Sequence, residues 1–95
     1  MGSPKRADAN QPELFAAWRL VGCAVQDLHE VGRGCPDALV CDPAGNLHLV
    51  EIKMPDCKLN TREALWHLMW SGKVYVVHTV EEALAMVGML PPTAK

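Results

Sequence analysis

The sequence predicts an α/β domain with the element order α-β-β-β-α-β-α and a mixed four-stranded sheet flanked by helices. Three features support this fold class: a β-hairpin signal over residues 38–53, an apolar stripe at helical spacing over residues 12–21, and a short apolar strand followed by a capped helix after residue 73. With 95 residues, of which 49% are hydrophobic, the chain has room for one core. We therefore expect one domain over residues 11–88, with loose tails at 1–10 and 89–95.

The first helix is expected over residues 12–21, where Pro12 occupies the first turn. Its apolar side chains recur at positions i, i+3, i+4 and i+7, namely Leu14, Ala17, Trp18 and Val21. Gly22 then stops the helix, and residues 24–30 are expected to form the first strand of the sheet.

Two apolar, β-prone runs, residues 38–41 and 47–53, flank the turn-forming segment 42–46. This pattern predicts a hairpin that is closed by Cys41 opposite Leu47. In an antiparallel pair of strands, the residue numbers of two directly opposed residues always add up to the same total. The pair Cys41 and Leu47 therefore fixes every other pair along the hairpin.

That register places Asp37 opposite Glu51, with their Cβ atoms about 4.5–5.5 Å apart on one face of the sheet. Side chains alternate along a strand, so Lys53 shares the face of Glu51 while Ile52 points into the other layer. Two carboxylates this close repel each other unless a cation or a proton lies between them. We expect a divalent metal, bound by Asp37, Glu51 and the backbone carbonyl of Ile52, and this all-oxygen set suits Mg²⁺ or Mn²⁺. Lys53 is placed to hold a phosphate or an attacking water, so the pattern indicates phosphodiester hydrolysis.

A second helix is expected over residues 60–70, ending at Gly72 as a C-cap. Its inward-facing side chains are predicted to be Leu65, Leu68 and Met69. Residues 73–78 form a nearly all-apolar strand of the buried kind. Thr79 then caps a last helix, with Glu82 as its capping-box partner.

The spacing of Pro36-Asp37 and Glu51-Ile52-Lys53 resembles that of the PD-(D/E)XK nuclease superfamily. The surrounding residues are similar to a stand-alone VRR-NUC domain, the virus-type replication-repair nuclease group, and the resemblance runs roughly from Pro12 to Val87. The segments that carry it are residues 27–37, 50–53 and 72–77, followed by 80–84. This resemblance implies a metal-dependent endonuclease acting on branched DNA, similar to the phage-type Holliday junction resolvases that work as homodimers in DNA recombination and repair.

The resemblance implies two further carboxylates as candidates for the catalytic site. In related nucleases a glutamate from the first helix often completes the metal site, and Glu13 is the acidic residue of that segment; a favourable charge at a helix N-terminus explains it equally well. Where the family usually has a glutamine after the lysine strand, this chain has Glu63. Because Asn60 and Glu63 also form a capping-box pattern, Glu63 is either a fourth acidic group of the catalytic site or a helix cap.

Four side chains near the predicted site are candidates for DNA contact: His29, Arg33, Lys58 and Arg62. The net charge of −2 is not that of a strongly basic nucleic-acid binder, although a bound cation would offset several of the acids locally. Lys73 is expected to be a solvated surface charge, and His67 and His78 are expected to be packing residues. The three tryptophans, Trp18, Trp66 and Trp70, are expected in the core, with a dimer interface as the alternative for one of them.

The cysteine spacing contains no Cys-X-X-Cys pair, so free thiols in a reducing cytoplasm are expected rather than disulfides or zinc. Neither a signal-peptide pattern nor an apolar run of membrane-spanning length is present, so we expect no secretion and no membrane partner. Two alternatives to a dimeric resolvase remain: a monomeric flap or nicking endonuclease, and a non-catalytic module that binds nucleic acid.

Overall fold

The structure is a computed structural model that describes residues 8–89, and it has the predicted element order with one added 3-10 turn. The elements are α1 (Gln11–Leu20), β1 (Ala24–Asp27), η1 (His29–Val31), β2 (Ala38–Cys41), β3 (Leu47–Ile52), α2 (Thr61–Met69), β4 (Val74–Val77) and α3 (Val80–Met86). Most of the two predicted tails, residues 1–7 and 90–95, lies outside the described residues.

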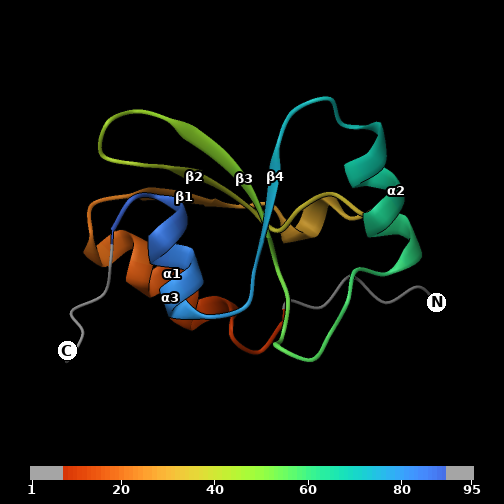
Figure 1. The fold of residues 1–95 in the computed structure, drawn as a ribbon, viewed down its shortest axis with the longest axis horizontal. Coiled ribbons are helices and arrows are strands. Elements are labelled where there is room, and N and C mark those ends of the chain that lie inside the picture. Colours follow the sequence, from red (N-terminus) through yellow and green to blue (C-terminus); the bar gives the residue numbers. More distant parts are fainter. Residues whose placement is uncertain (1–7, 90–95) are drawn as a thin grey trace.

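The four strands form one mixed sheet in the order β1-β2-β3-β4 (Figure 1). β1, β2 and β3 are antiparallel neighbours, whereas β4 runs parallel to β3 because the chain passes through α2 between them. Cys41 pairs with Leu47, so the predicted hairpin register is confirmed as far as the pair Ala38 and Val50. The hairpin is thus the element that local sequence specified most directly.

One face of this sheet carries the hydrophobic core. α1 and α3 lie side by side against it (Figure 1), and the apolar stripe of α1 is buried as predicted, with Leu14 1% and Trp18 0% exposed. The indole Nε1 of Trp18 donates a hydrogen bond to the carbonyl oxygen of Ala83 at 2.8 Å and so fixes α1 to α3. Ile52 is 1% exposed and belongs to this core, as the alternation along β3 predicts.

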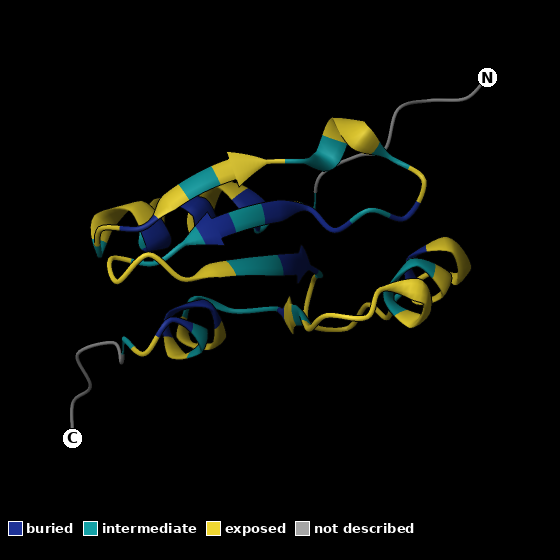
Figure 2. Ribbon diagram, turned by 90° about the horizontal axis from the view of Figure 1, so that it is seen from above, coloured by how far each residue is buried: buried dark blue, intermediate teal, exposed yellow. Residues whose placement is uncertain are grey.

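α2 does not join the core, and here the sequence-based expectation was wrong. The helix lies beyond the end of the sheet, away from α1 and α3, and is mostly exposed (Figures 1 and 2). Leu65, Leu68 and Met69 were expected to face inward but are 56%, 79% and 76% exposed. Glu63 is the buried residue of this helix. Helical periodicity identified an apolar side of α2 correctly, but periodicity alone does not establish what covers that side.

Several element ends differ from the predicted ones for local reasons. β1 ends at Asp27 because the Asp27 carboxylate accepts a hydrogen bond from the His29 backbone and starts the 3-10 turn. α2 ends at Met69 with Trp70 as its C-cap, so Gly72 is not the cap. The Thr79 hydroxyl caps α3 as predicted, by accepting from the Glu82 backbone N–H at 3.1 Å. The Glu82 carboxylate instead accepts from the backbone N–H of His78, at 2.7 Å.

Residues 8–10, expected in the loose N-terminal tail, contact the folded domain. The Asp8 carboxylate accepts a hydrogen bond from the Met54 backbone, and the Asn10 amide donates to the carbonyl oxygens of Lys53 and His78. The start of α1 is therefore held against the segment that leaves β3.

No disulfide joins any of the four cysteines, Cys23, Cys35, Cys41 and Cys57, all of which lie within the described residues. Among residues 8–89 there is no helix with both the length and the apolar character that crossing a membrane requires.

Candidate active site

The candidate site lies where β3 ends, between the loop that enters β2 and the N-terminus of α2. Three carboxylates are buried there: Asp37 is 2% exposed, Glu51 0% and Glu63 2%. Carboxylates are among the groups least often buried in proteins unless they are paired or bind a cation. Their collection at one end of the sheet is therefore the main indication of function.

Asp37 is held in place by both its backbone and its side chain. Its N–H donates to the Val50 carbonyl oxygen at 3.0 Å, and its own carbonyl oxygen accepts from the Leu28 N–H at 2.7 Å. Its carboxylate Oδ2 accepts from the Ile52 N–H at 2.8 Å. The regular ladder of β2 and β3 ends one residue earlier, so Asp37 is not a direct partner of Glu51 as the extended register predicted. Instead the carboxylate reaches along β3 to the residue after Glu51.

Glu51 lies on the face of β3 opposite to the core and is covered by α2. The His67 Nε2 of that helix lies 3.7 Å from the Glu51 Oε1. His67 was expected to be a packing residue, and its place beside Glu51 was missed. A usable signal existed, because Glu63 and His67 are four residues apart and so lie on one face of a helix.

Lys53 follows Glu51 by two residues and forms an ion pair with Glu63, with 2.7 Å between Nζ and Oε1. Burial acts to lower the pKa of Lys53. The hydrogen bond and charge of Glu63, together with the charges of Asp8 and Glu51, outweigh that effect and hold the pKa above its ordinary value. Lys53 is therefore a protonated, positioned cation at neutral pH.

Glu63 is a helix cap, one of the two roles that the sequence left open. Its Oε1 also accepts from the Asn60 N–H at 2.9 Å, while the Asn60 side chain accepts from the Glu63 N–H at 2.8 Å, which completes a capping box. The same carboxylate therefore starts α2 and binds Lys53.

The loop before Asp37 packs directly on the start of α2. Gly34 has a φ of 84°, and a Cβ at this position would collide with the carbonyl oxygen of Arg62. Glycine is thus required both by the backbone conformation and by the close approach of the two segments. This contact sets the distance between the Asp37 loop and the helix that supplies Glu63 and His67.

The other predicted site residues are distributed around this centre. Glu13 is exposed on α1 and lines a shallow hollow with Asn10, Met54 and Pro55; no described contact joins it to Asp37 or Glu51. His29 is bonded to Asp27 at 2.8 Å, an interaction that raises the pKa of His29. Lys58 is exposed in the loop before α2.

Arg33 and Arg62, by contrast, are brought together at one groove, although they are 29 positions apart in the chain. Lys73 packs over the Tyr75 ring, with 4.6 Å between its Nζ and the ring centroid.

The donor chemistry of the cluster fits a hard divalent cation. Lys53 pairs with Glu63 and His67 lies beside Glu51, so three buried carboxylates have one lysine and one histidine to offset their negative charge. Carboxylate and carbonyl oxygens are the ligands that Mg²⁺ and Mn²⁺ prefer. Within residues 8–89, no three His, Cys, Asp or Glu side chains are already arranged around one point as a metal site.

The mixed four-stranded sheet flanked by helices is consistent with a restriction-endonuclease-like α/β fold. No protein-family model matches the chain, and no curated protein matches its sequence. A solved structure described as a VRR_NUC domain is similar to it, with 25% sequence identity, a TM-score of 0.66, and coverage of 82% of this chain and 89% of that one. This similarity supports a VRR-NUC domain, and with it a nuclease domain family, for most of the chain.

Proposed function

We propose that this protein is a metal-dependent endonuclease that hydrolyses phosphodiester bonds in branched DNA, resembles the Holliday junction resolvases, and works as a homodimer. The observation that carries the proposal is the burial of three carboxylates, Asp37, Glu51 and Glu63, at the end of β3, with Lys53 paired to Glu63. Outside a functional site, such a cluster would cost stability with no compensating gain.

In this proposal Asp37, Glu51 and the Ile52 carbonyl would hold Mg²⁺ or Mn²⁺. Such an ion would supply a water of lowered pKa and stabilisation of the charge that develops on the phosphate. The hydrogen bond from the Ile52 N–H fixes the orientation of the Asp37 carboxylate. Lys53, kept protonated by its ion pair with Glu63, binds a non-bridging phosphate oxygen while water attacks the phosphorus and the bridging P–O bond breaks.

A homodimer is supported by the sheet face that the helices α1 and α3 leave uncovered. Leu47 is 66% exposed and Val76 37% exposed on that side. A hollow of about 210 Å³ includes Leu47, and it is lined by Ala24, Val25, Gln26, Leu39, Cys41 and Leu47. Burial of this surface by a second copy would add apolar area that one short chain lacks. Two sites related by a two-fold axis also match the symmetry of a four-way junction.

The test is cleavage of labelled four-way junction, flap, single-stranded and linear duplex DNA with Mg²⁺, with Mn²⁺ and with EDTA. Symmetric, metal-dependent cuts in opposing strands of the junction are the expected result. Cuts in flaps alone would favour a monomeric flap nuclease, and the absence of cutting in every substrate would favour a binding module.

Asp37→Asn is the decisive variant. An asparagine oxygen still accepts the Ile52 N–H, so the fold is preserved, but the negative charge needed for the metal is lost. We expect cleavage to fall by at least about 100-fold, the lower range for loss of one electrostatic catalytic group. Asp56→Asn, which neutralises an exposed carboxylate in the loop before α2, is the matched control and should cleave as the unmodified protein does.

A further inference from the structure

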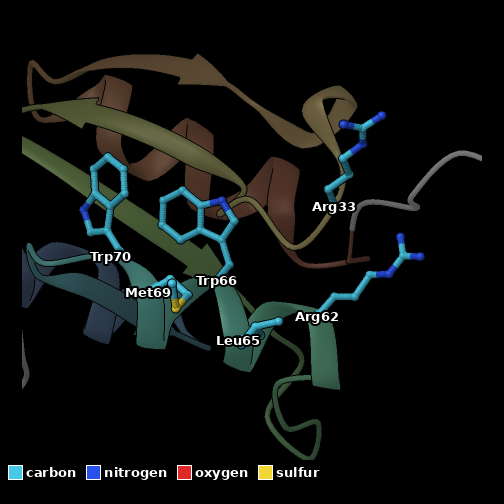
Figure 3. Close-up of a pocket in the computed structure, with 6 residues that line it drawn as sticks. All are labelled: Arg33, Arg62, Leu65, Trp66, Met69 and Trp70. Carbon is cyan, nitrogen blue, oxygen red and sulfur yellow. The ribbon is translucent and has the colours of Figure 1, made fainter.

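The groove beside α2 is the strongest feature that the proposed catalytic centre does not use. It has a volume of about 550 Å³ and is lined by Arg33, Arg62, Leu65, Trp66, Met69 and Trp70 (Figure 3). The two arginines extend at one end of the groove, and the two tryptophans lie at the other, with Trp66 between Trp70 and the arginines. Aromatic surface and cationic groups are therefore separated along one channel.

We infer that this groove binds one unpaired nucleotide of the DNA substrate, with its base on the tryptophans and its flanking phosphates at Arg33 and Arg62. The inference rests on the proposed function and deepens it: the enzyme would recognise branch points by a base that has left the duplex, rather than by the duplex alone.

The aromatic end has the form of a stacking surface. Trp66 and Trp70 are stacked on each other, with 4.7 Å between ring centroids and 20° between planes. Trp70 is nevertheless 46% exposed and Trp66 is half-buried, so ring area stays accessible. Stacking on tryptophan is a sequence-tolerant way to hold an unpaired base, because every base has a π-face.

The cationic end is complementary to phosphate. Within residues 8–89 neither Arg33 nor Arg62 forms a salt bridge, and none of the six lining residues is acidic. Arginine binds phosphate oxygens with two parallel hydrogen bonds. Arg33 also has a φ of 59°, an uncommon backbone conformation for a residue with a side chain.

The groove is connected to the candidate active site through α2 itself. Arg62 precedes Glu63, which binds Lys53. The Trp66 ring lies edge-on to His67, with 6.4 Å between centroids, and His67 contacts Glu51. A strand held in the groove would thus contact residues that directly adjoin Glu63 and His67 in α2.

Charge also favours DNA over a second copy of the chain as the occupant. A two-fold axis through the groove would bring two pairs of guanidinium groups into one desolvated interface, and the lining supplies no carboxylate to compensate them. A phosphodiester strand brings the opposite charge.

The test is titration of the full chain in EDTA with octathymidylate and with an octamer of abasic deoxyribose phosphate, followed by tryptophan fluorescence. Octathymidylate should quench the emission and bind more tightly than the abasic octamer. Trp66→Ala should weaken octathymidylate binding by about 5- to 150-fold, whereas Trp66→Phe keeps a stacking ring and should remain near the unmodified affinity. Arg62→Gln should reduce the slope of log affinity against log salt by about 0.7, the contribution of one single-strand phosphate.

Leu68→Ala is the matched control, because Leu68 is exposed on the same helix but does not line the groove. It should leave the affinity unchanged. Three results would overturn the inference. The two octamers could bind equally tightly, a folded Trp66→Ala protein could bind octathymidylate with unchanged affinity, or Trp66→Ala could lose dimerisation and nothing else. If Trp66→Ala fails to fold, Trp66→Phe and Arg62→Gln still decide the matter. If binding depends on the base but no DNA is cleaved, the groove binds a nucleotide as inferred and the proposed endonuclease activity is wrong. If DNA is cleaved but the fluorescence quenching does not depend on the base, the endonuclease proposal stands and the inference about the groove is wrong.

Discussion

At the scale of single residues, the Lys53–Glu63 pair determines how the catalytic hypothesis can be tested. Glu63 is 2% exposed and its partner's side chain 12%, so removal of the lysine leaves a buried carboxylate without its cation. We expect Lys53→Ala to destabilise the fold by about 3 kcal/mol as well as to abolish cleavage, since breaking a buried pair on one side is costly. Loss of activity in that variant alone is therefore ambiguous.

A double-mutant cycle separates the two effects. Lys53→Met combined with Glu63→Gln removes both charges, while the introduced amide oxygen can still accept the Asn60 N–H. The double variant should therefore lose less stability than the two single variants added together. Urea unfolding of the four proteins measures this, with Lys58→Ala as a surface control expected within about 0.5 kcal/mol of the unmodified protein. Strict additivity would mean that the pair does not couple, and that Glu63 acts as a cap only.

At the scale of elements, the hairpin turn between β2 and β3 depends on one carboxylate. Asp42 accepts hydrogen bonds from His48, from the backbone and side chain of Asn46, and from the backbone of Ala44. These bonds, led by that from His48, lower the pKa of Asp42 from 3.8 to about 2. The folded state therefore binds the Asp42 proton less readily than the unfolded chain does. Its contribution to stability is complete above pH 3.8 and is lost as the pH falls through about 2.

The lowered pKa of Asp42 leads to a prediction about how the stability of the hairpin turn depends on pH. The difference in unfolding free energy between the unmodified protein and Asp42→Asn should be largest above about pH 4 and should shrink as the pH approaches about 2. Urea unfolding monitored by circular dichroism across this pH range measures the difference. Asp27 and Glu82 also have lowered pKa values, but they are present in both proteins and cancel in the comparison. A difference that stays constant with pH would contradict the assigned role.

The contact between the Asp37 loop and α2 gives a second prediction at this scale. Gly34→Ala places a Cβ against the Arg62 carbonyl and on a backbone with positive φ, so it should force the loop and the helix apart. Cleavage should fall strongly, and stability should fall by about 1–3 kcal/mol from backbone strain. Gly32→Ala is the comparison, because it has the same sign of φ but open space around the added Cβ. An equal loss of activity in both variants would show that the loop conformation matters and that its contact with α2 does not.

At the scale of the whole molecule, the sequence predicted the features that depend on residues close together in the chain. It did not predict the features that depend on how elements distant in the chain pack together. The stripe of α1, the pairing of Cys41 with Leu47 and the alternation that buries Ile52 are local patterns, and all were confirmed. The position of α2 was not predictable, because its apolar residues fit a core helix equally well. The same limit explains the candidate site: Asp37 and Glu51 followed from the hairpin, whereas His67 reaches Glu51 only through the placement of α2.

That placement leads to a prediction about the stability of the whole domain. α1 and α2 have similar lengths, ten and nine residues, but α1 buries Leu14 and Trp18 in the core while α2 buries Glu63 alone. Helices gain most of their stability from packing, so α2 should open locally without global unfolding. Native-state hydrogen exchange of the full chain should show α1 amides exchanging only through global unfolding and α2 amides exchanging much faster, most of all near Trp70, far from the capping box. Octathymidylate should slow exchange in α2 and leave α1 unchanged. Equal protection of both helices in the free protein would instead mean that another surface, such as that of a second copy, already covers Leu65, Leu68 and Met69 in solution.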